Sequence, residues 1–411
     1  MDTKTVLTET PDREHRCPPL TIAIVTETYP PEINGVAMTL GRLIDGLRAQ
    51  GHTIHLIRPY QHTDGLERIE PRFSETLVRG IPIPRYSGLQ FGLPAGRLLT
   101  RLWRDNPPDI VHVVTEGPLG ASAIAAAAKL GLPMTSSFHT NFHRYSKHYG
   151  AGWLRGIIAG HLRKLHNRTA ATFVPTHALA AELGADGFAN LRVMARGVDT
   201  ALFNPARRST ELRREWNVGD SDLVVLYVGR LAAEKNLRMV LKSFDAIAEH
   251  RPDAKLVFVG DGPMMNKLKQ QCPHAVFCGS RRGEDLAAHY ASGDLFLFPS
   301  LTETFGNVTT EALASGLGVV AYAHAAAAEV IDSGDNGIAV PAGDETAYIE
   351  AAVSLACHPE RLALLRSHAA QRMQSFAWHR IVETFANTLT RVVKQHARRQ
   401  HGTNSIVLAP D

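Results

Sequence analysis

The sequence predicts an α/β chain built from two doubly wound, Rossmann-like domains. Two series of short apolar segments, each long enough for one buried strand, alternate with segments of helical periodicity. Strands that alternate with helices form a parallel sheet covered on both faces. With 411 residues the chain is long enough for two such domains, and its 44% hydrophobic and 20% charged content excludes a disordered or fibrous class.

The first series follows a polar leader at residues 1–19, which we expect to be loose. It opens with a βαβ unit and continues with three strands separated by two helices. The predicted elements are strand Leu20–Thr26, a helix with apolar residues at Val36, Leu40, Leu43 and Leu47, strand His52–Ile57, strand Asp109–Val114, helix Gly120–Lys129, strand Pro133–Phe138, helix Trp153–Arg168 and strand Ala171–Val174. They predict a first domain over residues 20–196 and a linker over residues 197–208.

The second series predicts a domain over residues 209–375. Its expected strands are Leu223–Val228, Leu256–Val259, Val276–Cys278, Leu295–Phe298, Gly318–Tyr322 and Gly337–Val340. A final helix at residues 376–395 is expected to return to the first domain. The polar residues 396–411 are expected to fray.

The net charge of +4 is unevenly distributed along the chain. Residues 1–200 hold 22 Lys and Arg against 17 Asp and Glu, whereas residues 201–411 hold 22 against 23. No acidic residue lies between Glu116 and Glu182, a stretch with several lysines and arginines. This excess predicts an anionic partner for the first half, such as a lipid, a nucleic acid or a phosphorylated ligand.

The cysteines and the apolar runs indicate where the protein works. Cys17, Cys272, Cys278 and Cys357 form no CxxC pair and have no zinc-site spacing, which favours a reduced, cytoplasmic protein. The charged N-terminus does not resemble a signal peptide, and no apolar run is long enough to span a membrane. Any membrane contact is therefore expected to be peripheral.

Two carboxylates lie in one segment after a predicted strand, in the sequence Phe298-Pro-Ser-Leu-Thr-Glu-Thr-Phe-Gly-Asn-Val-Thr-Thr-Glu311. Glu303 falls in the loop, Gly306 at the turn, and Glu311 on the following helix. A helix that begins at Asn307 would direct free N–H groups and the positive end of its dipole toward an anion. Glu311 would then accept hydrogen bonds from ribose hydroxyls, and Glu303 would face the group beyond the phosphates.

That spacing closely resembles the carboxylate pair of retaining glycosyltransferases of family 4, which have the GT-B fold. The resemblance extends from about Leu20 to Asn387. It is supported by further motifs in the family's order: Thr28-Tyr-Pro-Pro-Glu-Ile-Asn-Gly35, Gly229-Arg-Leu with Glu234-Lys-Asn, and Val259-Gly-Asp-Gly-Pro263. The resemblance implies two domains facing a cleft, with the acceptor in the first and the nucleotide-sugar in the second.

Two cations follow the first strand of the second domain. Arg230 and Lys235 are expected at the carboxyl edge of the sheet, where open parallel sheets bind ligands. Positive charge there suits a leaving diphosphate, because negative charge grows on the bridging oxygen as the glycosidic bond breaks. By the resemblance, His139 lies against the donor sugar. The implied nucleotide-sugar site also includes Gly35, Asp261, Ser280, Thr304, Phe305, Gly306 and Asn307.

No metal site is expected. Asp220-Ser-Asp222 matches a DxD motif, but it precedes a strand and so lies at the edge opposite the expected ligand, where a turn or cap role is the better interpretation. We expect Arg230, Lys235 and helix N–H groups to stabilise the leaving group in place of a divalent cation. No cofactor is expected beyond the nucleotide-sugar itself.

The helix near Trp153–Arg168 combines an apolar stripe with basic residues. Trp153, Arg155, Arg163, Lys164 and Arg168 would suit a helix lying on an anionic membrane or contacting the acceptor. The alternative is an ordinary amphipathic helix packed on the sheet. Arg97, Arg101, Trp103 and Arg104 form a second basic patch. No nucleic-acid partner is expected, because no recognisable motif accompanies the charge.

Two departures from the family pattern refine this prediction. Gly318 stands where proline is usual, and Ala325-Ala-Ala-Ala-Glu329 replaces a segment with a glycine pair before the glutamate. The added methyl groups put that loop's contact with the donor in doubt. Alanine-rich versions of this loop resemble a subgroup that uses mannosyl donors.

The predicted activity is metal-independent, retaining glycosyl transfer, with GDP-mannose as donor and a lipid-linked or glycolipid acceptor. The alternatives are a UDP-sugar-dependent glucosyl, galactosyl or sulfoquinovosyl transferase of the same fold, a sugar-nucleotide epimerase, and an idle binding module. The sequence lacks the epimerase pattern, and a binding module would not need both Arg230 and Lys235. We expect the protein in the cytoplasm, peripherally at the inner face of the plasma membrane.

Overall fold

The computed structural model describes residues 18–32, 34–61, 64–82, 90–139, 152–303 and 305–406. Contacts between residues divide the chain into two compact units. Unit 1 comprises Met1–Phe138, Ala159–Thr172 and Val382–Asp411, and unit 2 comprises His139–Ile158 and Phe173–Ile381. The predicted domains, residues 20–196 and 209–375, differ from these units. Each predicted domain contains all strands of one large sheet. The domain limits stay a prediction.

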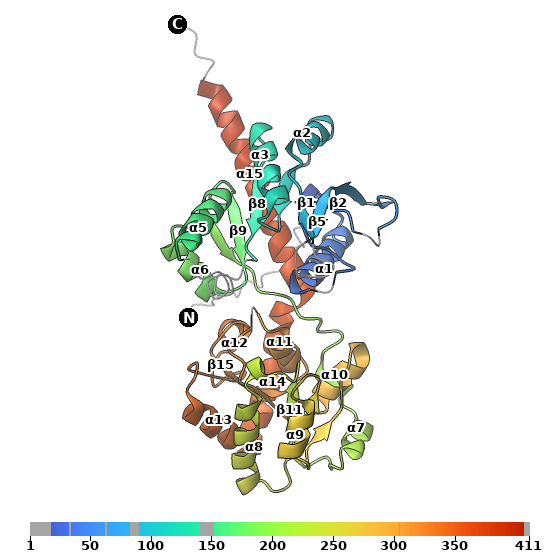
Figure 1. Ribbon diagram of the computed structural model, residues 1–411, viewed down its shortest axis with the longest axis vertical. Helices are drawn as coiled ribbons and strands as arrows, with labels where there is room; N and C mark the ends of the chain where they lie inside the picture. The colour runs from blue at the N-terminus through green and yellow to red at the C-terminus, as the bar shows by residue number, and fades with distance from the viewer. Residues whose placement is uncertain are drawn as a thin grey trace, which may run out of the picture. The chain divides into compact units, whose positions relative to one another are not determined.

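The first sheet has eight strands in the order β10-β9-β8-β7-β1-β2-β4-β3 (Figure 1). β1 pairs in parallel with β2 on one side and β7 on the other, so the chain winds outward from β1 in both directions. A short two-stranded sheet, β5-β6, accompanies it. The elements are β1 (Thr21–Val25), α1 (Gly35–Ala49), β2 (Thr53–Pro59), β3 (Ile69–Glu70), β4 (Phe73–Val78), β5 (Gly80–Pro82), β6 (Gln90–Gly92), α2 (Gly96–Asp105), β7 (Ile110–Val113), α3 (Pro118–Lys129), β8 (Met134–Ser137), α5 (Gly152–His166), β9 (Ala171–Val174), α6 (His177–Ala185) and β10 (Leu191–Val193).

The second sheet has six strands in the order β13-β12-β11-β14-β15-β16, and each pair is parallel. The elements are η1 (Pro205–Arg207), α7 (Thr210–Glu215), β11 (Val224–Val228), η2 (Ala233–Lys235), α8 (Leu237–His250), β12 (Lys255–Val259), α9 (Met265–Gln271), β13 (Val276–Phe277), α10 (Gly283–Ala291), β14 (Leu295–Phe298), α11 (Asn307–Ala314), β15 (Gly318–Tyr322), α12 (Ala326–Val330), β16 (Ile338–Val340), α13 (Glu345–Cys357), α14 (Pro359–Met373), η3 (Gln374–Phe376) and α15 (Trp378–Ile406). The predicted α/β class with two doubly wound halves is confirmed.

Local sequence accounts for the entry into α1. The side-chain oxygen of Asn34 accepts the N–H groups of Val36 and Ala37 at 3.1 and 2.9 Å, which satisfies two donors that have no partner within the helix. Leu40 and Leu47 then face the core at helical spacing. The chain therefore turns into α1 shortly after β1 ends.

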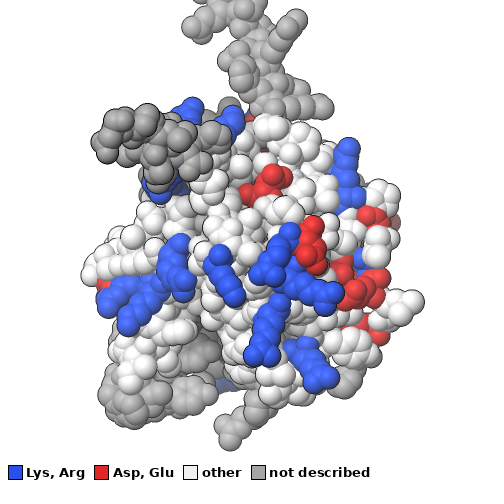
Figure 2. Space-filling view, turned by 90° about the horizontal axis from the view of Figure 1, so that it is seen from above, with Lys and Arg blue, Asp and Glu red and all other residues white. Residues whose placement is uncertain are grey.

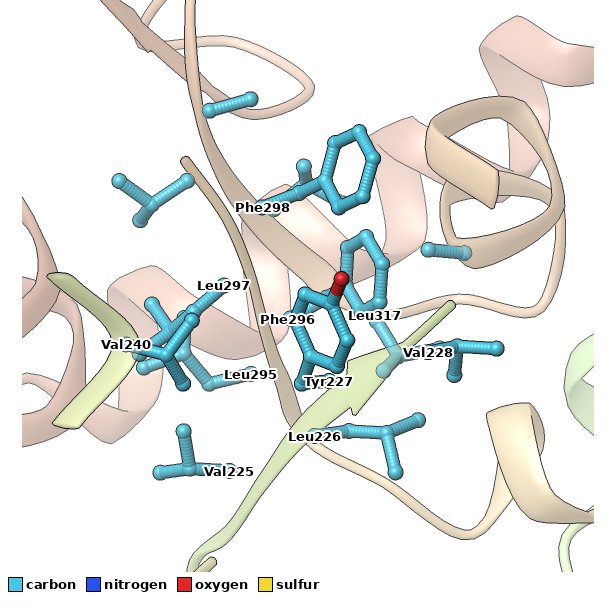
Figure 3. Close-up of a cluster of buried hydrophobic side chains, with 14 of the residues drawn as sticks. Val225, Leu226, Tyr227, Val228, Val240, Leu295, Phe296, Leu297, Phe298 and Leu317 are labelled. Atoms are coloured by element: carbon cyan, nitrogen blue, oxygen red, sulfur yellow. The ribbon is translucent and has the colours of Figure 1, made fainter. Parts of the chain in front are cut away.

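The core of unit 2 is built on the central strands of its sheet (Figure 3). All five residues of β11 and all four of β14 are buried, as expected for strands covered on both faces. Tyr227 stacks on Phe298, with ring centroids 6.2 Å apart. The Tyr227 hydroxyl donates to the backbone oxygen of Arg230 at 3.3 Å, which ties the packed core to the loop after β11.

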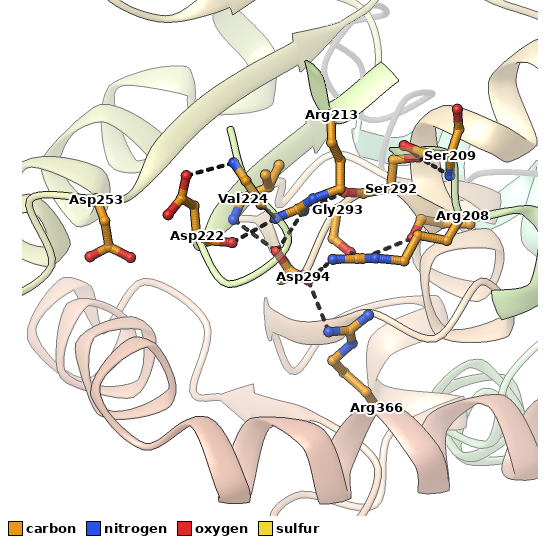
Figure 4. A network of polar contacts seen from close by, with 12 residues as sticks. Arg208, Ser209, Arg213, Asp222, Val224, Asp253, Ser292, Gly293, Asp294 and Arg366 are labelled. Carbon is orange, nitrogen blue, oxygen red and sulfur yellow. Dashed lines mark hydrogen bonds and ion pairs between the residues drawn. The ribbon is translucent and has the colours of Figure 1, made fainter. Parts of the chain in front are cut away.

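A buried carboxylate joins three arginines at the start of β14 (Figure 4). Asp294 is 6% exposed. Its Oδ1 accepts hydrogen bonds from Arg208 and Arg366, both at 2.9 Å, and its Oδ2 accepts one from Arg213 at 3.1 Å. Oδ2 also accepts the backbone N–H of Val224 at 2.9 Å, which fixes the beginning of β11 beside that of β14.

The structure adds elements that the sequence prediction lacked. β3, β4, β5, β6 and β10 were not predicted. Helix α15 continues to Ile406, beyond the predicted end at residue 395 and into the stretch expected to fray. Phe385 of α15 contacts His112 of β7 edge to face within unit 1, with ring centroids 4.9 Å apart.

No helix in the described part of the chain combines the length and the apolar character needed to cross a membrane.

Candidate active site

The candidate site lies where the winding of the second sheet changes direction. β11 and β14 are adjacent and parallel, but the chain leaves β11 toward β12 and reaches β14 on the opposite side. The carboxyl ends of two such strands form a crevice in which open α/β sheets bind ligands. Arg230 and Lys235 follow β11, and Glu303 follows β14, so the sheet brings the predicted cations and the predicted carboxylate to the same edge.

Lys235 and Glu303 are in direct contact across this crevice. The Lys235 ammonium donates to Glu303 Oε1, and Ser300 Oγ donates to the same oxygen at 2.9 Å. The two side chains are 19% and 17% exposed, so solvent still reaches both. The backbone oxygen of Glu234 also accepts a hydrogen bond from Thr302 Oγ1, at 3.2 Å, so the two loops are linked at more than one point.

Arg230 does not join this contact. Its side chain is 68% exposed, and its ion pair is with Glu234 at 3.8 Å. An exposed pair of this kind contributes little to stability. The guanidinium at the end of β11 is therefore accessible to an anionic ligand from solvent.

The turn into α11 requires a glycine. Gly306 has a φ of +88°, in the left-handed region, and a Cβ there would lie 3.3 Å from Glu303 Cγ. α11 begins at the next residue, Asn307, without a side-chain cap. The turn thus places the N-terminus of α11 next to Glu303, as the sequence predicted.

Glu311 lies on α11 and is half-buried. Tyr290 of α10 donates its hydroxyl to Glu311 Oε2 at 3.0 Å. Burial raises the pKa of Glu311 from 4.5 to about 7, and the hydrogen bond from Tyr290 opposes this rise. Glu311 therefore changes its charge near neutral pH and can accept or donate hydrogen bonds there.

This pKa makes the stability of unit 2 depend on pH. The folded protein keeps the Glu311 proton up to about pH 7, whereas the unfolded chain loses it near pH 4.5. The free energy of unfolding should fall as pH rises between these values, by on the order of 3 kcal/mol from this group.

We expect Glu311→Gln to remove this loss, so the variant should gain stability over the wild type as pH rises from 4 to 8. Urea unfolding across this range measures the difference. Burial also raises the pKa of Glu27 to about 7. Because Glu27 is present in both proteins, its contribution cancels in the difference between their free energies of unfolding. If the free energies of unfolding of the two proteins changed in parallel with pH, the raised pKa of Glu311 would be contradicted.

The remaining predicted donor-site residues surround this edge. Gly260 and Gly262 flank Asp261 after β12 with φ values of +138° and +158°, and Asp261 Oδ1 accepts the N–H of Gly262 at 2.6 Å. Ser280 is exposed in the loop after β13. Phe305 is 1% exposed, so it packs in the domain rather than presenting its ring to solvent. Thr304 lies outside the described residues.

Gly35 and His139 belong to the first sheet's carboxyl edge. Gly35 is the first residue of α1, and His139 follows β8 and is half-buried. Their roles toward a donor sugar stay predictions.

The basic helix α5 packs in part on the core. Leu162 and Leu165 are 6% and 5% exposed, so this part of the apolar stripe is not available to a membrane. Ile157 is 60% exposed. Arg163, Lys164 and Arg168 are exposed, and the side chains of Trp153 and Arg155 lie outside the described residues. The second half of the apolar stripe therefore packs on the core, as the alternative interpretation expected. Membrane contact by the basic residues stays a prediction.

Three residues near this site were missed from the sequence. Tyr290 contacts Glu311 and Ser300 contacts Glu303, as described above. Arg196 lies over the ring of Phe305, with its guanidinium carbon 5.7 Å from the ring centroid, and burial lowers its pKa. Ser300 stands in the quoted motif and was recoverable, but nothing in the sequence connects Tyr290 or Arg196 to α11.

The DxD-like segment has a turn role. Asp222 Oδ2 accepts the N–H of Gly219 at 2.7 Å. Among the residues that the structure describes, no three His, Cys, Asp or Glu side chains gather as a metal site.

Comparison with known proteins follows the same two halves. A family model described as "Glycosyltransferase Family 4" matches residues 33–202, and one described as "Glycosyl transferases group 1" matches residues 222–358. A GDP-mannose-dependent alpha-mannosyltransferase of Corynebacterium glutamicum is 31% identical over 362 residues, covering 88% of this chain and 86% of the relative. The chain belongs to glycosyltransferase family 4. It is an enzyme of the hexosyltransferase class.

Other family members are similar over most of the chain. A GDP-mannose-dependent alpha-mannosyltransferase of Mycobacterium tuberculosis is 34% identical, covering 84% of this chain and 90% of the relative. A sulfoquinovosyl transferase of Arabidopsis thaliana is 30% identical, with coverage of 89% and 72%. The solved structure of a sucrose-phosphate synthase from Thermosynechococcus elongatus superposes with a TM-score of 0.68 at 17% identity, covering 92% of this chain and 100% of that one, and confirms the GT-B fold.

The alanine-rich loop adopts a backbone conformation that favours glycine. Ala325, at the N-cap of α12, has a φ of +51° and a ψ of −125°. A side chain with a Cβ seldom adopts this conformation, so the methyl group of Ala325 stands in a strained turn.

Proposed function

We propose that this protein is a metal-independent, retaining mannosyltransferase that uses GDP-mannose and a lipid-linked or glycolipid acceptor. The observation that carries the proposal is the contact between Lys235 and Glu303 at the point where the second sheet changes direction, beside the N-terminus of α11. The GDP-mannose dependence of the two mannosyltransferase relatives supports the donor. The cationic excess of the first half supports an anionic lipid acceptor or its membrane.

Each group then has a defined role. The diphosphate of the donor lies between Arg230, Lys235 and the first N–H groups of α11, which oppose the charge that grows on the leaving oxygen. Glu311 accepts hydrogen bonds from the ribose hydroxyls. Glu303 faces the sugar, and His139 and Gly35 keep the contacts with the donor that the family resemblance implies.

The transfer proceeds on one face of the sugar. The bond between the anomeric carbon and the phosphate oxygen breaks, and the acceptor oxygen bonds to that carbon from the same face. The acceptor's hydroxyl proton passes to the leaving phosphate oxygen. The α configuration of the donor is retained because the acceptor enters on the face that the phosphate leaves. No metal ion is needed, because Arg230 and Lys235 supply the positive charge.

The proposal is tested by incubating the protein with labelled GDP-mannose and a membrane lipid extract, with EDTA present. We expect label in the lipid phase and an α-mannoside by NMR. A β-linked product would overturn retention, and loss of transfer with EDTA would overturn metal independence. Transfer from UDP-sugars but not from GDP-mannose would favour the alternative suggested by the sulfoquinovosyl transferase relative. Isomerised donor would indicate an epimerase, and binding without turnover an idle module.

The ribose assignment predicts a binding defect. Glu311→Ala removes the carboxylate that would bond the ribose hydroxyls, so GDP should bind about tenfold or more weakly, the loss of one to two hydrogen bonds to a charged group. Calorimetry with GDP measures the dissociation constant. Glu350→Ala, which changes an exposed glutamate of α13, is the matched control and should bind as the wild type does. An unaltered dissociation constant for Glu311→Ala would show that Glu311 does not bind the ribose.

A further inference from the structure

A groove of about 1000 Å³ opens between α2 and α3 in unit 1, far along the chain from the candidate active site. Its floor and walls are partly apolar, formed by side chains that include Leu77, Leu93, Leu98 and Ala125. Leu98 is 45% exposed, although it is a large aliphatic side chain. The groove therefore offers apolar surface to something other than this chain.

Five cations line the same groove, and no acidic residue does. They are Arg79, Arg97, Arg101, Arg104 and Lys129, all exposed. The one ion pair among them joins Arg101 to Asp105 at 3.9 Å, and its side chains are 85% and 59% exposed. In the described part of the chain, no carboxylate pairs with the other four. Figure 2 shows lysine and arginine side chains gathered on the face seen from the end where α2 and α3 lie in Figure 1.

The arginines of α2 do not contribute to the buried face of the helix. Leu99 and Trp103 bury one face of the helix, at 0% and 1% exposure, and Arg97, Arg101 and Arg104 repeat at helical spacing on the groove side. Like charges at this spacing repel. The helix dipole disfavours Arg97 in the first turn, although it favours Arg104 in the last. Folding therefore does not require these charges, and an anion in the groove would relieve their repulsion.

We propose that the groove between α2 and α3 binds the headgroup of an anionic phospholipid. The cations match its phosphodiester, and the apolar walls with exposed Leu98 match the glycerol and the first methylenes of its chains, which a free phosphate ion lacks. Binding here would hold unit 1 against a membrane surface without any spanning helix. This binding would be separate from the proposed transfer reaction and would not require the nucleotide-sugar.

Vesicle co-sedimentation without donor or acceptor tests this. The wild type should sediment with phosphatidylcholine vesicles that contain phosphatidylglycerol and not with phosphatidylcholine alone. Arg97→Gln/Arg101→Gln/Arg104→Gln should reduce this partition at least about tenfold, since each basic residue near an anionic surface adds to the attraction. The single variant Lys129→Gln, on the facing helix α3, should also weaken the partition onto vesicles. It keeps the test decisive if the triple variant folds poorly.

The matched control is Arg214→Gln/Lys267→Gln/Arg361→Gln, which removes the same charge from exposed positions of unit 2. It should sediment as the wild type does. Equal losses in the two triple variants would overturn the proposal in favour of a general charge effect. Displacement by inorganic phosphate at constant ionic strength would show a phosphate site instead, and unchanged sedimentation of the groove variants would exclude the groove. Because turnover is not measured, none of these outcomes bears on the proposed transferase activity.

Discussion

Lys235→Ala should lower kcat for mannosyl transfer by about 10²–10³-fold, or roughly 3–4 kcal/mol of transition-state stabilisation, the effect of losing one preorganised donor at a developing charge. The Lys235 ammonium lies at the carboxyl edge between β11 and β14, in contact with Glu303. Its charge opposes the negative charge that forms only as the bond to phosphate breaks. The KM for GDP-mannose should therefore change less than kcat.

Steady-state kinetics with saturating GDP-mannose measure this effect. Lys242→Ala is the matched control, because Lys242 lies on α8 of the same unit and its ion pair with Glu345 is exposed. Its kcat should equal that of the wild type. Lys235→Arg keeps the charge but not the geometry, so we expect partial recovery. An unchanged kcat in Lys235→Ala would remove this residue from the leaving group.

Asp294→Ala should destabilise unit 2 by about 3 kcal/mol or more, because removing one partner of a buried ion pair leaves an uncompensated charge. Arg213 is 1% exposed, and without Asp294 its remaining partners are neutral backbone oxygens of Gly219, Asp222 and Ser292. The same substitution frees the N–H of Val224, at the start of β11. The effect should therefore appear as a loss of folding stability rather than as a change of chemistry.

Urea unfolding of the wild type and the variant measures this loss. Asp335→Ala is the control, since Asp335 makes an exposed ion pair with His368 and should cost less than about 1 kcal/mol. At a temperature where Asp294→Ala is still folded, its kcat should be close to that of the wild type. A loss below 1 kcal/mol for Asp294→Ala would show that the arginines are stabilised by solvent instead.

Several buried strands were predictable because strands that are covered on both faces are mostly apolar. The sequence predicted Ala171–Val174 and Leu295–Phe298, and these are the bounds of β9 and β14. By contrast, β3 has both residues exposed and β5 is mostly exposed, so neither carries a hydrophobic signal. Edge strands of this kind depend on pairing with a neighbour, which local sequence does not encode.

The far end of α15 shows the opposite effect. The polar composition after residue 395 suggested fraying, yet the helix continues to Ile406. Ala397, Arg398, Arg399 and Gln400 are strong helix formers. His396 Nε2 also lies 2.8 Å from the backbone oxygen of Gly131, a contact that local sequence does not reveal. The polar composition therefore did not rule out a helix in this stretch.

Much of the candidate site followed from one rule, that parallel strands bring their carboxyl ends to one edge. This rule placed Lys235 and Glu303 together although they are far apart in sequence. It could not supply the hydrogen bond from Tyr290 to Glu311 or the stacking of Arg196 on Phe305, because these depend on how helices and loops pack over the edge.

The edge formed by β11, β12 and β14 is where we expect the nucleotide-sugar to bind. Hydrogen–deuterium exchange with and without saturating GDP-mannose tests it most directly. Exchange should slow in peptides that cover residues 229–236, 260–263 and 299–311, and stay unchanged in α2 and α3. Saturable GDP-mannose binding with no protection of these three segments would show that the nucleotide-sugar binds elsewhere.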